Sequence, residues 1–130
     1  MAYLVNQLGL IVAWDCSTAN AHDTIFHDLI AEFQDTTVVL TDMGFHAKAG
    51  DPPNLKPCAR GPWNVRMLVE TILSMLTTVC HFKHVSHRRW SYFMMRLAFT
   101  MAMFNILVLW DGLPTDADGV IHLSIAQFSL

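Results

Sequence analysis

The chain has 130 residues, of which 53% are hydrophobic and 15% are charged, and its formal net charge is −3. This composition excludes an intrinsically disordered chain and fits one globular domain, since a chain of this length can bury only one sizeable core. The net charge alone gives no reason to expect a nucleic-acid partner. The three cysteines form no CxxC pair, and the first residues lack the pattern of a secretory leader, which favours a reducing cytoplasm.

The charges are distributed unevenly along the chain. All eight Lys and Arg residues lie between positions 48 and 96, where Asp51 and Glu70 are the only acids, so this window carries a formal charge of +6. The first 47 residues hold six acids and neither Lys nor Arg. A basic middle between acidic ends is a candidate surface for an anionic partner.

A hairpin and a helix are predicted first. Residues 3–6 and 10–16 are rich in β-branched and aromatic side chains and flank Gly9, which is typical of two strands joined by a tight turn. From residue 25 to residue 33, apolar side chains recur at helical spacing and predict an amphipathic surface helix. The acids of this segment are predicted to face outward: Asp23, Asp28, Glu32 and Asp35.

A strand and a long loop follow. Residues 37–41 form a continuous run rich in β-branched side chains, typical of a strand buried on both faces. The run ends at Asp42, and the order strand, helix, strand predicts a mixed α/β sheet. Residues 47–63 contain six Gly and Pro residues, so they predict a loop without regular structure. Long loops in compact domains are commonly functional, and this one carries Lys56 and Arg60.

The first of two further helices is predicted to begin at Asn64. Apolar residues repeat there at helical spacing, opposite a polar face that includes Glu70. If this helix continues without a break, three side chains further along lie close to the line of Glu70. These are His81, His84 and Arg88.

The second helix is predicted over residues 90–110. It is apolar nearly all round, which predicts that other elements enclose it. Its most apolar stretch, residues 97–110, is shorter than the roughly 20 residues that a membrane-spanning helix needs, so we expect no membrane partner. The alternative is a membrane-associated segment with Arg96 and Asp111 at the interface. In the tail, residues 111–130, we identify no chemistry.

Asp42 and Glu70 are the first candidate site. Carboxylate oxygens are the ligands that Mg²⁺ prefers, and phosphoryl transfer combines such metal ions with cations that hold the phosphate backbone. Two carboxylates near Lys and Arg residues suit that chemistry. The alternative is structural, with Asp42 capping a turn and Glu70 paired with Arg66 one helical turn earlier.

Two other groups of side chains have the residue types of metal ligands. Cys80, His84 and His87 would share one face of a continuous helix, and Cys58 would complete a zinc site. A solvated, partly basic helix end is the alternative. The third group is Asp23 with His27 and the adjacent His22, a metal or acid/base pair for which helix capping by the acid is the simpler explanation.

Three segments resemble the catalytic domain of bacterial insertion-sequence transposases of the DDE type, over roughly residues 3 to 108. They are Tyr3-Leu4-Val5 with Gly9 and Asn20-Ala21-His22-Asp23; Leu40-Thr41-Asp42-Met43-Gly44-Phe45-His46; and Trp63-Asn64-Val65-Arg66 with Glu70. The most specific part is a strand-end Asp-x-Gly-aromatic followed, after a loop, by aromatic-x-x-Arg-x-x-x-Glu.

The resemblance implies an RNase H-like fold, in which a mixed five-stranded sheet has helices on both faces. It also implies transposition of DNA by two-metal phosphoryl transfer with Mg²⁺ or Mn²⁺. Asp42 then corresponds to the second catalytic Asp and Glu70 to the catalytic Glu, both as metal ligands. The side chains expected at the DNA are Lys56, Arg60, Arg66, His81, Lys83, His84, Arg88 and Arg89.

The sequence departs from the family pattern at several positions. Trp63 stands where the family usually has Tyr, and Thr77 stands where it expects a Lys or Arg. No residue matches the family's first catalytic Asp, because that Asp lies on a strand before the predicted hairpin. We therefore expect a truncated domain without its first strand, with negligible cleavage activity alone.

This interpretation divides one partial domain, residues 1–130, into a hairpin-helix-strand part (1–46), the basic loop (47–63), two helices (64–110) and the tail (111–130). The expected partners are transposon-end and target DNA, an upstream transposase fragment and a second copy of the chain. The expected location is the cytoplasm, at the nucleoid when DNA is bound. The alternative function is a small zinc-stabilised interaction module built on Cys58, Cys80, His84 and His87.

Overall fold

The structure, a computed structural model, describes all residues except 19, 48, 59–63, 83–85, 112–116 and 118–130, and only the backbone of residues 64–68 and 111. The elements in chain order are β1 (Ala2–Val5), β2 (Ile11–Asp15), η1 (Asp23–Phe26), α1 (His27–Ala31), β3 (Val39–Thr41), η2 (Met43–Phe45), β4 (Leu55–Pro57), α2 (Asn64–Thr78) and α3 (Trp90–Asp111). The η elements are short 3₁₀ helices.

The chain divides into two compact units. Met1–Leu4 and Val12–Pro62 form the strand unit, whereas Val5–Ile11 and Trp63–Leu130 form the helical unit. The described strands make two sheets of two strands each, β1 with β2 and β3 with β4. This is mixed α/β content, and an RNase H-like arrangement of it stays a prediction.

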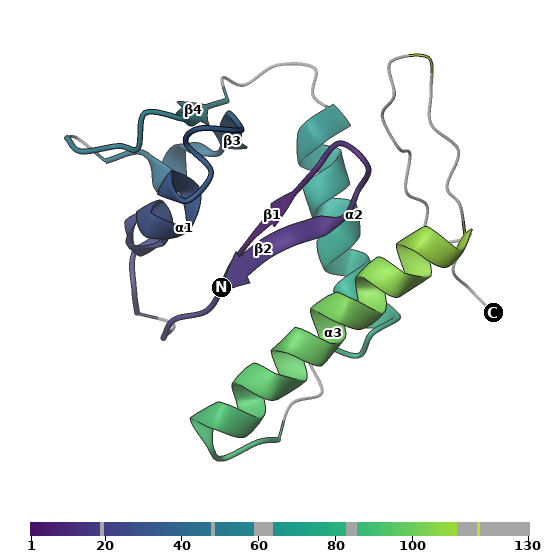
Figure 1. Ribbon diagram of the computed structural model, residues 1–130. Helices are drawn as coiled ribbons and strands as arrows, with labels where there is room; N and C mark the ends of the chain where they lie inside the picture. Colours follow the sequence, from purple (N-terminus) through teal and green to yellow (C-terminus); the bar gives the residue numbers. More distant parts are fainter. Residues whose placement is uncertain (19, 48, 59–63, 83–85, 112–116, 118–130) are drawn as a thin grey trace. The chain divides into compact units, whose positions relative to one another are not determined.

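The first two strands form the predicted hairpin (Figure 1). Asn6 stabilises the turn, because its Oδ1 accepts hydrogen bonds from the backbone N–H groups of Leu8 and Leu10, each at 3.0 Å. Gly9 has a φ of 74°, a conformation that costs glycine little. The hairpin prediction is confirmed, and each strand end lies within one residue of the expected position.

The helix predicted over residues 25–33 is shorter than expected. The chain forms η1 and then α1, which ends at Ala31. Ile30 is buried, whereas Ile25 is exposed, so only part of the predicted apolar face is covered. The acids of this segment are exposed as predicted: Asp23, Asp28, Glu32 and Asp35.

β3 and β4 pair in parallel, with Val39 opposite Leu55. The prediction that residues 47–63 lack regular structure is therefore wrong. Pro57 is tolerated in β4 because it lies at the end of a short strand of a two-stranded sheet, where a missing N–H donor costs little. The prediction that the first of these strands is buried on both faces is also wrong, because Leu40 is 50% exposed while Val39 is buried.

The core of the strand unit is small. Ile30, Val39 and Leu55 form its buried cluster, and Leu4 and Phe45 pack against it. The buried Asn54 also ties α1 to the segment before β3: its Nδ2 donates to the backbone oxygens of Ile30 at 2.8 Å and Thr37 at 3.2 Å. The amide thus adds a hydrogen bond to each oxygen, and the Ile30 oxygen also accepts the Phe33 N–H at 3.1 Å.

In the helical unit, α2 begins at Asn64 as predicted but does not continue to Arg88. It ends at Thr78, and His81 has a φ of 51°, in the left-handed region that does not continue a helix. The N–H groups of Val79 and Cys80 both donate to the Met75 oxygen, at 2.8 and 3.2 Å. His81 and Arg88 are therefore not on one helical line with Glu70. His84 lies outside the described residues.

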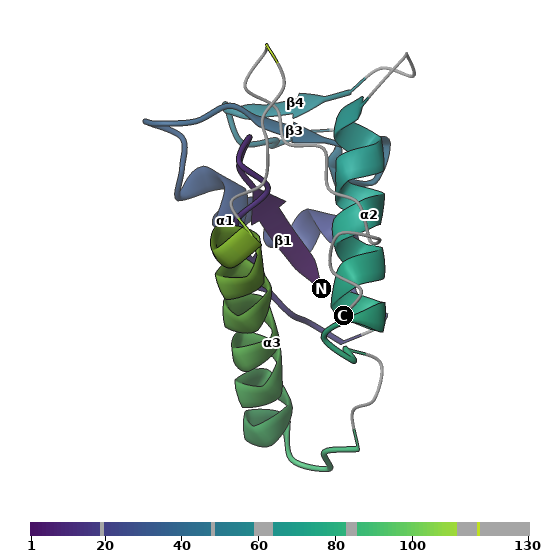
Figure 2. The same ribbon diagram turned by 90° about the vertical axis from the view of Figure 1, so that its right-hand side faces the viewer.

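α3 covers Trp90–Asp111, so its predicted limits are confirmed. It lies alongside α2 (Figure 2). The prediction that other elements enclose it is wrong for the described residues, because only one face is buried. The buried side chains are Leu97, Thr100, Met101, Phe104 and Val108; large exposed ones are Trp90, Tyr92, Met95, Phe99, Met103, Ile106, Leu109 and Trp110.

By length and composition alone, Trp90–Trp110 could cross a membrane, and 28% of its apolar window is buried. Two polar side chains of α3, Thr100 and Asn105, interrupt its apolar sequence and make hydrogen bonds within the helical unit. Thr100 is buried and donates through Oγ1 to the Arg96 oxygen at 2.9 Å. Asn105 pairs with the backbone of Ile11: Oδ1 accepts its N–H at 2.9 Å, and Nδ2 donates to its oxygen at 2.8 Å. The amide thus acts as a strand partner for one residue of the hairpin.

Replacing Asn105 with Ala should destabilise the chain. Both backbone groups of Ile11 would lose their partner, which costs about 1 to 3 kcal/mol of unfolding free energy for partly buried groups. The matched control is Ile106→Ala at the next, exposed position, where we expect a change within about 0.5 kcal/mol. Urea denaturation followed by circular dichroism measures both, and equal losses in the two variants would contradict the assignment.

Candidate functional site

Asp42 lies directly after β3, as predicted, and its side chain is exposed. It is the N-cap of η2, and its Oδ1 accepts a hydrogen bond from the Gly44 N–H at 2.9 Å. This is the turn-capping alternative of the sequence analysis, and the capping bond uses one of the two carboxylate oxygens. Capping and metal binding are therefore compatible at Asp42.

Gly44 allows a second carboxylate to approach. A Cβ on this residue would lie 2.9 Å from Oδ2 of Asp23 and 3.1 Å from Oδ1 of Asp42. The absence of a side chain at Gly44 thus leaves room for both acids, one from η1 and one from the end of β3. Sequence reasoning did not connect Asp23 with Asp42, because the two are separated by α1.

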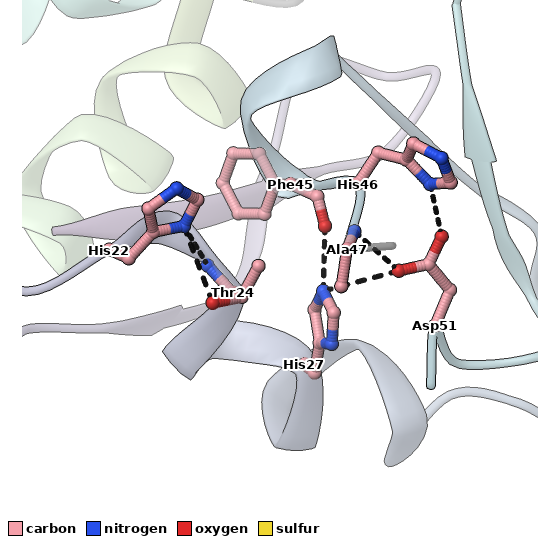
Figure 3. A network of polar contacts seen from close by, with 7 residues as sticks. All are labelled: His22, Thr24, His27, Phe45, His46, Ala47 and Asp51. Atoms are coloured by element: carbon pink, nitrogen blue, oxygen red, sulfur yellow. Dashed lines mark hydrogen bonds and ion pairs between the residues drawn. The ribbon is translucent and has the colours of Figure 1, made fainter. Parts of the chain in front are cut away.

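His27 joins α1 to the end of η2 (Figure 3). Its Nε2 donates to the Phe45 backbone oxygen at 2.6 Å, since a carbonyl can only accept. The same nitrogen lies 3.8 Å from Oδ1 of Asp51. The predicted pairing of His27 with Asp23 is thus replaced by partners further along the chain.

Asp51 is the centre of the network in Figure 3. Its Oδ1 accepts the Ala47 N–H at 2.8 Å, and its Oδ2 forms a short hydrogen bond with Nδ1 of His46. The Ala47 hydrogen bond, followed by the hydrogen bond and charge interactions with His46 and His27, holds the pKa of Asp51 below its ordinary value. Only the tertiary contacts reveal this residue as part of a cluster.

Glu70 lies on α2 in the helical unit and is exposed, whereas Asp42 belongs to the strand unit. The backbone of Arg66 is part of α2, but its side chain is not among those described. No three His, Cys, Asp or Glu side chains among the described residues are grouped closely enough to hold a metal ion. A metal centre shared by Asp42 and Glu70 therefore stays a prediction.

The described candidates for DNA contact are exposed. Lys56 lies on β4, His81 lies in the turn after α2, and Arg88 and Arg89 immediately precede α3. The Arg89 guanidinium lies 5.9 Å from the centre of the Tyr92 ring, a cation–π contact that holds it at the start of α3. Of the remaining candidates, Arg60, Lys83 and His84 lie outside the described residues, and only the backbone of Arg66 is described.

The alternative zinc site stays a prediction, but the continuous helix expected to carry three of its ligands is interrupted. Cys80 follows the end of α2, so it does not share a continuous helix with His87. Cys58 belongs to the strand unit. Burial raises the pKa of the Cys80 thiol above its ordinary value, and the charge of Arg96 partly opposes this effect.

One acidic hollow was not expected from the sequence. It has a volume of about 450 Å³ and lies between β2 and α1. Its lining residues are Val12, Ala13, Trp14, Asp15, Asp28, Leu29 and Glu32. The acids come from segments 13 or more residues apart, so no local motif indicates them.

Replacing Asp51 with Asn should remove an acid-sensitive contribution to stability. The lowered pKa of Asp51 means that the folded state favours its ionised form, so the stabilisation is present above its ordinary pKa and is lost as the pH falls through the lowered value. Urea denaturation between about pH 6 and about pH 3 should therefore show a smaller loss for the variant than for the unchanged chain. The control is the exposed Asp35→Asn; an identical pH dependence in Asp51→Asn and the unchanged chain would contradict the prediction.

Comparison with protein-family models, with curated protein sequences and with solved structures found no match to this chain. The function of the chain is therefore inferred from its own residues and from the motifs around Asp42 and Glu70.

Proposed function

We propose that the chain forms part of a DDE-type transposase catalytic domain, in which Asp42 and Glu70 are two of the acidic metal ligands. The complete domain would cut and join DNA by two-metal phosphoryl transfer. The chain itself would contribute these two ligands and bind DNA.

The observation that carries this proposal is the position of Asp42. Its exposed carboxylate follows β3, at the carboxyl end of a parallel strand pair. Ligand sites of open α/β sheets lie outside the carboxyl ends of their parallel strands. The ladder extends to this end, because the Cys58 N–H donates to the Thr41 oxygen at 2.8 Å.

The donor chemistry suits Mg²⁺ or Mn²⁺. Asp42 and Glu70 are exposed carboxylates, which supply the hard oxygen ligands that these ions prefer. When bound, such ions activate the attacking oxygen and stabilise the leaving oxygen of a phosphodiester. The protein would supply the ligands and hold the DNA backbone through exposed cations such as Lys56, Arg88 and Arg89.

A metal titration tests the shared site. Mn²⁺ added to the chain with a DNA duplex should broaden the amide NMR signals of Gly44 and Glu70 together, because both would lie near one metal centre. Asp42→Asn should abolish both effects, whereas the exposed Asp35→Asn should preserve them. Broadening at only one of the two residues, or only around the acidic hollow of Asp15, would overturn the shared site.

DNA binding provides a second test. In Arg88→Gln/Arg89→Gln, the loss of two phosphate contacts should lower affinity and reduce the slope of log K against log salt by about 2. Fluorescence anisotropy with a labelled duplex at several salt concentrations measures both quantities. Gln7→Glu/Gln34→Glu changes the net charge equally at two exposed positions and should leave the slope unchanged. An unchanged slope in the arginine variant would contradict a DNA contact there.

A further inference from the structure

Side-chain hydrogen bonds hold both ends of the η2 turn, and Asp42 makes the first of them. At its start, Oδ1 of Asp42 accepts the Gly44 N–H at 2.9 Å. At its end, Nε2 of His27 donates to the Phe45 oxygen at 2.6 Å. The Phe45 ring packs against the core of the strand unit and lies 6.5 Å from the Phe26 ring. A shift of η2 would therefore move the backbone that holds the Asp42 carboxylate.

Asp51 braces the second end of this turn. Its carboxylate holds the Ala47 N–H and the His46 ring, which are the two residues directly after Phe45. It also lies 3.8 Å from Nε2 of His27, the atom that holds Phe45. One carboxylate thus connects the residues on the far side of η2 with the histidine of α1 (Figure 3).

From these contacts we propose that His27, Asp51 and His46 are positioning residues, which fix η2 and thereby the direction of the Asp42 carboxylate. Their role in metal binding rests on the proposed function, whereas their effect on Asp42 does not. Among the described residues, two acids lie on the elements that carry this cluster: Asp23 on η1, beside Gly44, and Asp28 on α1. Both are acids, so neither can replace the histidines as donors.

The test uses the Gly44 amide as a reporter of the Asp42 hydrogen bond, in the full chain without metal or DNA. In His27→Gln the side-chain amide reaches the position of Nε2 and can still donate to Phe45, whereas in His27→Asn it is too short. We expect His27→Asn to shift the Gly44 NMR signal and to speed its hydrogen exchange about tenfold, the effect of losing one hydrogen bond. His27→Gln should restore both values.

A second pair of variants uses His46, which is exposed, so its replacement should leave no cavity in the core. His46→Asn keeps a donor at the position of Nδ1 and should preserve the Gly44 signal, whereas His46→Ala should perturb it. The control is His22→Ala, since the contacts of His22 in Figure 3 are with Thr24 alone. A Gly44 amide that is unchanged in both His27→Asn and His46→Ala would overturn the proposal.

Mn²⁺ broadening in the same variants separates this proposal from the proposed function. If the Gly44 amide responds as expected and Mn²⁺ binding weakens in parallel, both are supported. If the amide responds but even the unchanged chain binds no Mn²⁺ at Asp42, the positioning role stands and the proposed function fails. If Mn²⁺ binds equally well in all variants while the amide responds, the proposed link between position and metal binding is wrong.

Discussion

The parallel pairing of β3 with β4 is the constraint on which the candidate site depends. Parallel strands cannot be joined by a tight turn, so the chain must return from the end of β3, at Thr41, to the start of β4, at Leu55. The returning segment contains Asp42, η2, His46 and Asp51. Each of these lies where it does because the connection must travel back along the strand pair.

Hydrogen bonds made by the side chains of this connection supplement the small hydrophobic core of the strand unit. Among the described residues, Ile30, Val39 and Leu55 form the buried cluster of the strand unit. Hydrogen bonds therefore position much of the connection: Asn54 holds two backbone oxygens, and Asp51 holds Ala47 and His46. Because these polar bonds depend on geometry and on the charge of Asp51, the same contacts that stabilise the unit also set the surroundings of Asp42.

In the helical unit, one side-chain amide also forms hydrogen bonds with backbone groups of a distant segment. Ile11, at the edge of the hairpin turn, needs a partner for its N–H and its oxygen, and Asn105 of α3 provides both. On α3 itself this places a polar residue on the inner side, while Phe99 and Leu109 are each 67% exposed. The helix is therefore apolar on its buried face, apart from Thr100 and Asn105, and also on much of its exposed face. A surface helix usually carries polar side chains on its exposed face instead.

Local patterns determined the elements with strong periodicity. The hairpin, the start of α2 and both ends of α3 follow from alternation, helical spacing and the Gly9 turn, because each of these signals lies within a few neighbouring residues. The position of Asp42 at a strand end followed from the same kind of pattern. The capping alternative for Asp42 was also readable, since an acid before a Gly-containing turn is a common cap.

The remaining features were decided by contacts between segments that are distant in sequence. β4 has three residues, one of them Pro, and forms only because β3 offers it a ladder. No Gly or Pro marks the end of α2 between Thr78 and Phe82. The cluster of His27, His46 and Asp51 unites residues whose partners lie up to 24 positions away, and Asn105, which in the sequence only interrupts an apolar run, finds its partner at Ile11. Hydrogen bonding over such separations leaves no periodic signal, so only the tertiary structure could decide which polar side chains are structural and which surround the candidate site.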